Sequence, residues 1–283
     1  DRSILDGVLH LGDYIYEYGV ARYGDTTIGR INIPPHEIVT LKDYRTRHSL
    51  YRLDKGLRRV HQQHPFIVIW DDHEIANNSH MTGAQNHQPE KEGDYEKRKA
   101  AARQAYYEWL PIRERDELYR SFSFGPLADI FMLDERLAGR SPEIKDMNDP
   151  SYNSADRSML GAKQLEWFES KLKGSSATWK LVGNQVMFSD VYLKSVYPKM
   201  PRNLDSWDGF PVEKKKIVDV IVQNKIQNII IVSGDTHASW AIEAAIDVKK
   251  KYSPFAVEFG TTSVTSGNGD EGKNADTVKL SEQ

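Results

Sequence analysis

Four short apolar segments of this chain are each followed at once by polar side chains that can bind metal ions. Each segment and the residues after it are Val8 to Leu11 before Gly12-Asp13, Phe66 to Trp70 before Asp71-Asp72-His73-Glu74, Trp179 to Val182 before Gly183-Asn184-Gln185, and Ile229 to Val232 before Ser233-Gly234-Asp235-Thr236-His237. Several of the segments are apolar on both faces, as buried strands are. In an open α/β sheet, ligand sites lie beyond the carboxyl ends of the strands. The sequence therefore predicts that the four polar clusters meet at one rim.

Helical patterns alternate with the strand candidates, which predicts a layered α/β domain. Further strands are expected at Asp129 to Leu133 and Phe255 to Phe259. Helices are expected at about 94–109, 161–173 and 212–224, and from a capping box at Thr40 to Asp43 until Pro65, this last one carrying Leu50, Leu53, Leu57 and Val60 on one face. We see no repeat and no linker, so residues 1–266 are predicted to form one domain. Residues 267–283 have the composition of a flexible tail.

Composition excludes several classes of site. The 283 residues include 38 basic and 41 acidic side chains, and a net charge of −3 gives no field that would gather nucleic acid or an anionic membrane. The chain has no cysteine, which excludes disulfides, thiolate metal sites and a thiol nucleophile. It also lacks a long apolar span, a signal-peptide pattern, a nucleophile elbow and the glycine-rich nucleotide-binding loops.

The polar clusters point to metal chemistry when they are taken together. A lone Gly-Asp pair usually forms a turn or a helix cap, and a buried Asp-His pair is often a satisfied polar contact. Carboxylates and imidazoles from four strand ends, however, would repel one another in a pocket unless cations compensated them. The oxygen-rich set, with Tyr16 as a phenolate ligand, favours iron, manganese or calcium over structural zinc. A bridging aspartate would suit two-metal phosphate chemistry.

Five blocks of the sequence resemble, in order, the motifs of the alkaline phosphatase D (PhoD-type) family of metallophosphatases. The blocks are 12–17, 70–74, 183–187, 233–237 and 258–266. The resemblance implies a four-layer metallophosphatase sandwich of mixed sheets flanked by helices. It also implies hydrolysis of phosphate monoesters or diesters with a ferric ion and calcium ions, other divalent metals being alternatives. A hydroxide bound to the metal ions would then attack phosphorus in line.

The resemblance also assigns roles to single residues. It makes Asp13 the bridging and catalytic carboxylate, and Tyr16 and His237 ligands of iron. Asp72 would bind the second metal, and Asp235 would bind on the calcium side. Asn78 would lie near the calcium ions, with the neighbouring Asn77 as the alternative for this position. His73 would contact the phosphate or the leaving group during catalysis. Arg136 would hold a ligand or the phosphate, and Asn184 and Gln185 would support the ligands from behind.

Parts of the family pattern have no counterpart in this chain. The missing parts are a preceding β-sandwich domain, the first core strand with its metal-binding cysteine, and a C-terminal hairpin. We therefore predict that the fold is incomplete at both ends, and that the absence of cysteine reflects the missing first strand. Two alternatives follow: a truncated, catalytically impaired domain that binds metal or phosphate, and a phospholipase D-like diesterase.

The resemblance implies partners and a location as well. The expected partners are small phosphate esters, with phosphodiesters of nucleic acid, teichoic acid or phospholipid as further candidates. No stable nucleic-acid or membrane partner is expected, and the chain is predicted to be a monomer in the periplasm, secreted or at the cell surface. His61 and His64 at a helix end could chelate a metal, but they are interpreted as surface groups. His80 and His87 lie in a loop over 77–93 that is interpreted as a disordered surface loop, with a lid as the alternative.

Overall fold

The computed structural model describes residues 5–20, 22–24, 26–191, 202–247, 251–264 and 266–267. It contains two β-sheets. The smaller pairs β1 (Val8–His10) with β2 (Phe66–Val68) in parallel. The larger has the strand order β3-β4-β5-β6-β8-β7, with β3 (Arg120–Phe124), β4 (Ala128–Met132), β5 (Trp179–Gly183), β6 (Ile229–Ser233), β7 (Trp240–Asp247) and β8 (Lys251–Gly260). Its middle strands are parallel, and β3 and β7 at its two edges are antiparallel to their neighbours.

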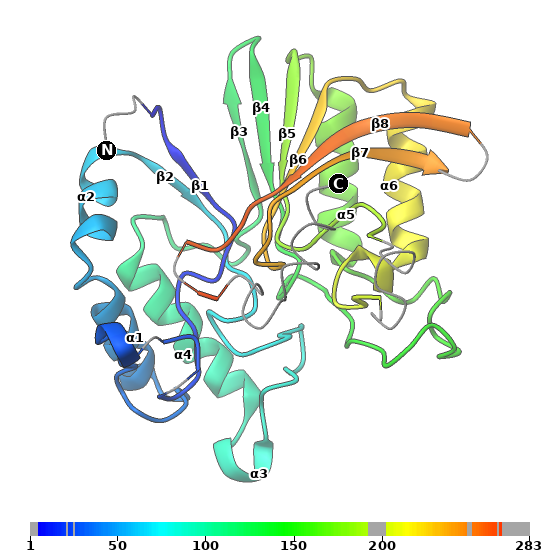
Figure 1. Cartoon of the computed structure of the whole chain (residues 1–283). Coiled ribbons are helices and arrows are strands. Elements are labelled where there is room, and N and C mark those ends of the chain that lie inside the picture. The colour runs from blue at the N-terminus through cyan, green and yellow to red at the C-terminus, as the bar shows by residue number, and fades with distance from the viewer. Residues whose placement is uncertain are drawn as a thin grey trace, which may run out of the picture.

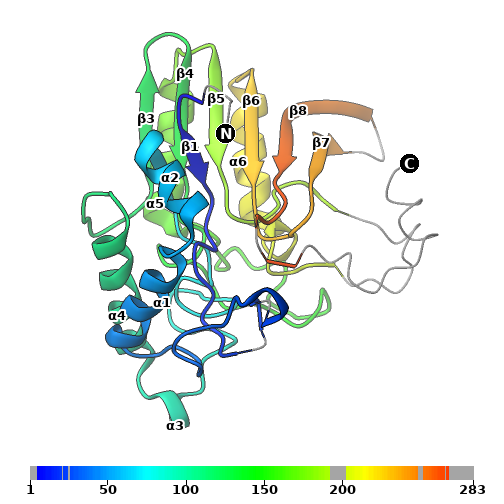
Figure 2. The same ribbon diagram turned by 60° about the vertical axis from the view of Figure 1, so that its left-hand side comes forward.

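Helices cover the outer side of each sheet. The helices α1 (Leu41–Tyr51), α2 (Lys55–Gln63) and α4 (Tyr95–Trp109) lie beside the small sheet, and α5 (Gly161–Gly174) and α6 (Pro211–Gln223) lie behind the large one (Figures 1 and 2). Shorter elements are η1 (Thr26–Ile28), α3 (Pro89–Glu92) and η2 (Trp207–Gly209). The result is a four-layer arrangement of helices, two sheets and helices, which confirms the predicted fold class.

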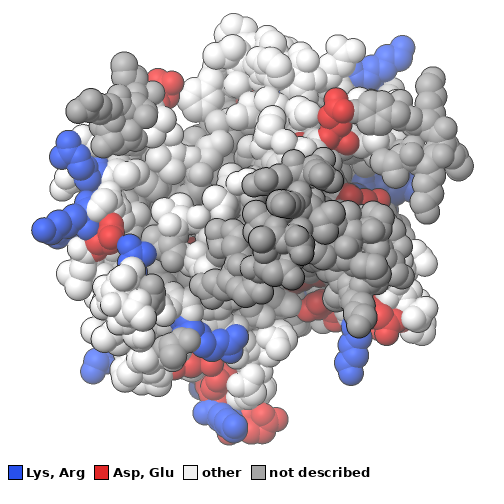
Figure 3. All heavy atoms as spheres, viewed as in Figure 1, with Lys and Arg blue, Asp and Glu red and all other residues white. Residues whose placement is uncertain are grey.

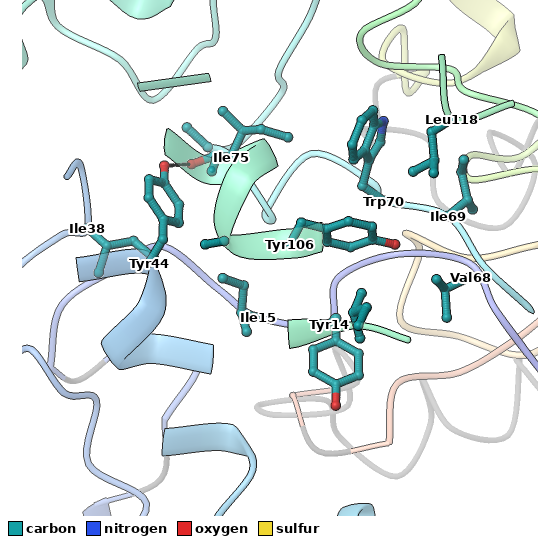
Figure 4. Close-up of a cluster of buried hydrophobic side chains, with 14 of the residues drawn as sticks. Tyr14, Ile15, Ile38, Tyr44, Val68, Ile69, Trp70, Ile75, Tyr106 and Leu118 are labelled. Carbon is teal, nitrogen blue, oxygen red and sulfur yellow. Dashed lines mark hydrogen bonds between the residues drawn. The ribbon is translucent and has the colours of Figure 1, made fainter. Parts of the chain in front are cut away.

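Two apolar cores fix the layers. One joins the small sheet to α1 and α4, with Tyr14, Tyr44, Trp70 and Tyr106 among its buried members (Figure 4). The other fills the space between the large sheet and α5 and α6. Burial of apolar surface stabilises both cores by about 25 cal/mol per Å². The strand ends are thereby held against each other from both sides.

The predicted single helix from Thr40 to Pro65 is wrong. The capping box at Thr40 forms, but α1 ends at Tyr51, and Asp54 starts a second helix by accepting a hydrogen bond from the Leu57 backbone N–H at 2.8 Å. Leu53 lies in the break and is 67 % exposed, so it does not share a buried face with its neighbours. An aspartate that caps a new helix outcompetes continuation of the old one.

Other differences concern edge strands and loops. The edge strands β3 and β7 were not expected, because neither carries the continuous apolar run of a buried strand. The loop over 77–93 is ordered: it contains α3, a bridge between His80 and Gly83, and a backbone hydrogen bond from Asn86 to Asn77. The predicted flexible tail lies, beyond Gly267, outside the described residues.

The surface and the helices add two observations. On the face seen in Figure 3, basic and acidic side chains are scattered among one another. Among the described residues, every helix is too short or too polar to traverse a lipid bilayer.

Three histidines surround Tyr14, with ring centroids 5.2 Å (His10), 6.0 Å (His48) and 5.8 Å (His61) from its own. The interpretation of His61 as a surface group is wrong, because its Nε2 lies 2.9 Å from the Tyr14 hydroxyl. Burial lowers the pKa of His10 to about 4 and that of His48 to about 3. Within the described part of the chain, neither ring nitrogen of His48 has a hydrogen-bond partner. The fold therefore requires His48 to be neutral.

This requirement makes stability depend on pH. Burial lowers the pKa of His48 from its ordinary value of 6.5 to about 3 in the folded chain, so the unfolded chain takes up the proton first as the pH falls. We expect His48 to lower the free energy of unfolding by roughly 2–3 kcal/mol between pH 7 and pH 4.5. Urea denaturation of the wild type and of His48→Phe at both pH values measures this, because the difference between the chains cancels their shared carboxylates. A difference that is the same at both pH values contradicts the assignment.

Candidate metal centre and active site

The residues that follow β1, β2 and β6 line one cavity, and the end of β5 is hydrogen-bonded beside it, so the four strand ends share one rim as the sequence predicts. Backbone hydrogen bonds join neighbouring ends: the N–H of Gly234 donates to the Gln185 carbonyl at 2.8 Å, and that of Asn184 donates to the Val232 carbonyl at 2.9 Å. The cavity has a volume of about 410 Å³. Its lining consists of Asp13, Tyr23, Asp72, His73, Asn77, Asn78, Asp235, Thr236, His237 and Gly267.

Two groups of possible metal ligands lie at this cavity. The ligand atoms of Asp13, Asp72 and His73 lie within 4.8 Å of one another, and so do those of Asp71, Asp72 and Asp235. Asp72 therefore belongs to both groups. The structure thus brings the carboxylates of three separate strand ends into reach of the same cations.

Asp13 also faces the residues assigned to iron. The Tyr16 hydroxyl donates to Asp13 Oδ2 at 3.1 Å and lies 3.0 Å from His237 Nε2. His237 Nε2 itself is 3.9 Å from Asp13 Oδ2. Asp13 thus contacts Tyr16 and lies close to His237, Asp72 and His73, so its carboxylate is within reach of both sets of side chains, as a bridging carboxylate would be.

The backbone at these residues is locally strained. Seven described non-glycine residues have positive φ, and five of them, with φ between 50° and 64°, line the cavity: Asp13, Tyr23, Asn78, Asp235 and His237. Such conformations cost of order 1–3 kcal/mol each and gather at functional sites. Gly12 has φ 112°, and a Cβ there would lie 2.3 Å from the Asp71 backbone nitrogen. Only glycine allows the two strand ends to approach this closely.

The charges of the site are unbalanced without cations. Burial, together with Asp72 and Asp71, raises the pKa of Asp13, and burial and Asp71 raise that of Asp235. Burial opposes ionisation of Asp72 as well, but Arg136 and His73 hold its pKa at about 2. Within the described residues, Asp13 Oδ1 and Asp71 Oδ2 are buried without hydrogen-bond partners. These orphaned oxygens and the mixed oxygen and nitrogen donors fit hard cations.

His73 is held by Glu17, a residue for which the sequence predicts no role. Its Nδ1 lies 2.6 Å from Glu17 Oε2, and Glu17 Oε1 accepts a hydrogen bond from the Asn77 backbone N–H at 2.8 Å. Glu17 is fully buried. The contact leaves Nε2 of His73 as the free ring nitrogen. Although burial opposes protonation, Asp72, Asp13 and Glu17 raise the pKa of His73.

Arg136 lies behind the carboxylates and does not line the cavity. Its Nε is 2.5 Å from Asp71 Oδ1, its Nη1 is 2.8 Å from Asp205 Oδ2, and its Nη2 is 3.5 Å from Asp235 Oδ1. The guanidinium is fully buried. Of the two roles predicted for Arg136, the structure therefore places it in contact with ligands rather than where it would meet a phosphate.

Further buried side chains hold the strand-end loops together. Glu74 accepts hydrogen bonds from the backbone N–H groups of Asp13 at 3.1 Å, Tyr14, and Asp71 at 2.9 Å. Gln185 donates from Nε2 to the carbonyls of Trp70 at 3.0 Å and Leu133 at 2.6 Å. Asn184 is buried and donates to the Val186 carbonyl. Both Asn184 and Gln185 thus support the rim without lining the cavity.

Asn77 and Asn78 both line the cavity. Asn78 donates its backbone N–H to Asp72 Oδ2 at 2.6 Å and its side-chain amide to Glu143 Oε2 at 2.7 Å. Its own Oδ1 accepts from the Asn77 amide at 3.1 Å. The pair is therefore linked, and Asn78 makes the direct contact with a ligand carboxylate.

Comparisons with known proteins agree with this geometry. The family model described as PhoD-like phosphatase matches residues 1–283. Alkaline phosphatase D of Bacillus subtilis (strain 168) is 38 % identical in an alignment 294 residues long, gaps included, that covers 98 % of this chain and 49 % of that protein. A solved structure of PhoD matches with a TM-score of 0.82 at 35 % identity, over 94 % of this chain and 52 % of the other. The chain spans about half the length of these relatives.

Proposed function

The chain belongs to the PhoD-like phosphatase family, and on this premise we propose that it hydrolyses phosphate esters, both monoesters and diesters, at the strand-end cavity. The observation that carries the proposal is the pair of ligand groups that share Asp72. Such an arrangement suits two-metal phosphate chemistry. Membership of the family does not say which phosphate ester this chain hydrolyses, so the hydrolysis of both monoesters and diesters is part of the proposal.

We propose that Asp13, Tyr16 and His237 hold a ferric ion, that Asp71, Asp72 and Asp235 hold calcium, and that Asp13 would serve both ions as the bridging carboxylate. Cations bound there would polarise the phosphoryl oxygens and lower the pKa of the attacking water. Asn78 would orient Asp72 through its backbone N–H. Arg136 would keep Asp71 and Asp235 in place from behind.

His73 would act on the substrate itself. With Nδ1 fixed by Glu17 at 2.6 Å, its Nε2 is the nitrogen available to a phosphoryl oxygen or to the leaving group. A preorganised donor of this kind typically contributes 10²–10³-fold to the rate. Hydrolysis by this route needs no serine, threonine or cysteine nucleophile. The expected location, in the periplasm, secreted or at the cell surface, and the expected monomer stay predictions.

Turnover of two chromogenic esters at alkaline pH tests the proposal. The purified chain is stripped with a chelator, reloaded with iron and calcium, and assayed with 4-nitrophenyl phosphate and bis(4-nitrophenyl) phosphate. We expect turnover of at least the monoester, loss of it on chelation and recovery on reloading. Metal binding without turnover of either ester would favour the impaired metal-binding domain, and turnover of the diester alone would favour a diesterase.

A further inference from the structure

We infer that the leaving group of the substrate packs against the ring of Tyr23, and that the cavity favours phosphate esters whose leaving group is a flat aromatic ring. The inference rests on the proposed phosphatase function and extends it to a substrate class. It is carried by the place of Tyr23 in the cavity, by the stacking of its ring and by its backbone conformation.

Tyr23 lies beside the groups expected to handle phosphate. It lines the cavity together with Asp13, His73 and His237, and its ring centroid is 5.4 Å from that of His73 and 5.9 Å from that of His237. The side chain is 39 % exposed. A phosphoryl group that contacts these imidazoles would therefore place its ester substituent within reach of the Tyr23 ring.

The rest of the described lining is polar or lacks a side chain. Apart from Tyr23 and the two histidines, it consists of Asp13, Asp72, Asp235, Asn77, Asn78, Thr236 and Gly267. Among these described lining residues, Tyr23 supplies the one phenol ring. An apolar leaving group would bind most favourably where it stacks on this ring. Contact with the carboxylates and amides would be less favourable, because these polar groups would lose their hydration.

The Tyr23 ring is held in advance of binding. It stacks on the buried Tyr16 ring at 4.3 Å with 15° between the planes, and on Tyr18 at 5.5 Å with 17°. The Arg22 guanidinium lies 3.8 Å from the Tyr18 ring centroid. A side chain that is already ordered loses little conformational entropy when a ligand stacks against it.

The backbone of Tyr23 is strained in the same way as that of the metal ligands. Its φ of 51° is unusual for a bulky side chain, and four cavity residues share this conformation. If the Tyr23 ring served only to pack on Tyr16, it would not need to be partly exposed to the cavity. The strain, the exposure and the position together assign Tyr23 to ligand contact.

Matched aromatic and alkyl substrates test the inference. We expect Tyr23→Ala to lower kcat/KM for phenyl phosphate by about 5- to 20-fold relative to kcat/KM for ethyl phosphate. Tyr23→Phe should keep the wild-type ratio, because it keeps the ring. The control Tyr119→Ala removes an aromatic side chain that packs on Trp167 at 4.9 Å and does not line the cavity, and should also leave the ratio unchanged.

Binding of inert analogues separates this inference from the proposed function. The metal-loaded chain is titrated calorimetrically with phenylphosphonate and with methylphosphonate, neither of which is turned over. Weaker binding of phenylphosphonate alone in Tyr23→Ala supports the inference even if no ester is hydrolysed. An equal loss for both analogues, or no loss for either, overturns it, since an equal loss would mean that Tyr23 only positions Tyr16.

Discussion

Asp13→Asn is expected to lower kcat/KM for phosphate esters by about 10³-fold or more without unfolding the chain. The Asp13 carboxylate contacts the Tyr16 hydroxyl, lies 3.9 Å from His237, and shares a possible ligand group with Asp72 and His73, so we expect it to serve both cations. Asparagine keeps the shape of the side chain and tolerates the φ of 56° better than most residues do. It removes the negative charge that cations need.

The apo chain should be no less stable with this substitution. Burial and the neighbouring Asp72 and Asp71 already oppose ionisation of Asp13, so a neutral group there removes repulsion. Thermal unfolding with and without chelator measures this: we expect an unchanged or higher apo midpoint and a smaller rise on adding metal. The control Asp219→Asn, in a surface ion pair with Lys215 on α6, should change neither activity nor midpoint appreciably. Full activity in Asp13→Asn would refute the bridging assignment.

Arg136→Met is expected to lower the free energy of unfolding by about 3–5 kcal/mol. The buried guanidinium compensates Asp71, Asp205 and Asp235. Methionine would leave Asp71 and Asp235 without this counter-charge, while Asp205 would keep its contact with Arg140 at 2.5 Å. Removal of one partner from a buried ionic network costs far more than removal from a surface pair. Urea denaturation at pH 7.5 of the metal-free chain measures the loss.

Two further variants make this result specific. Arg45→Met removes a guanidinium that makes a bidentate contact with Glu108 at the surface, and should have a much smaller effect. Combining Arg136→Met with Asp71→Asn should restore part of the stability, because it neutralises a buried carboxylate that the substitution leaves without its guanidinium. Equal losses for Arg136→Met and Arg45→Met would show that the buried network contributes nothing particular.

The strand ends could be predicted from sequence because their signal is local. An apolar run stops and a ligand-type residue follows within one or two positions, as at Asp13, Asp72 and Asp235. Since parallel strands end at the same edge, four such local signals were enough to predict one shared rim, of which three strand ends supply residues to the cavity. The main helices were equally readable from their caps and apolar faces, except where Asp54 starts α2.

The resemblance named Arg136, Asn184 and Gln185, but the contacts of the supporting residues could not be predicted, because their partners lie far away in the chain. Arg136 contacts Asp71, 65 residues earlier, and Asp205, 69 residues later. Glu17 reaches His73 across 56 residues. The sequence offered only that Glu17 falls inside the block 12–17 and that Asp71 precedes Asp72. Such contacts depend on how the layers pack, which no local pattern encodes.

The most direct test of the metal centre is elemental analysis of the reloaded chain alongside its turnover of 4-nitrophenyl phosphate. We expect at least two metal ions per chain and activity that rises in proportion to bound metal. In Asp72→Asn we expect both metal content and activity to fall, because Asp72 belongs to both ligand groups. Full turnover by the metal-free chain, or wild-type metal content and activity in Asp72→Asn, would contradict the proposed metal centre.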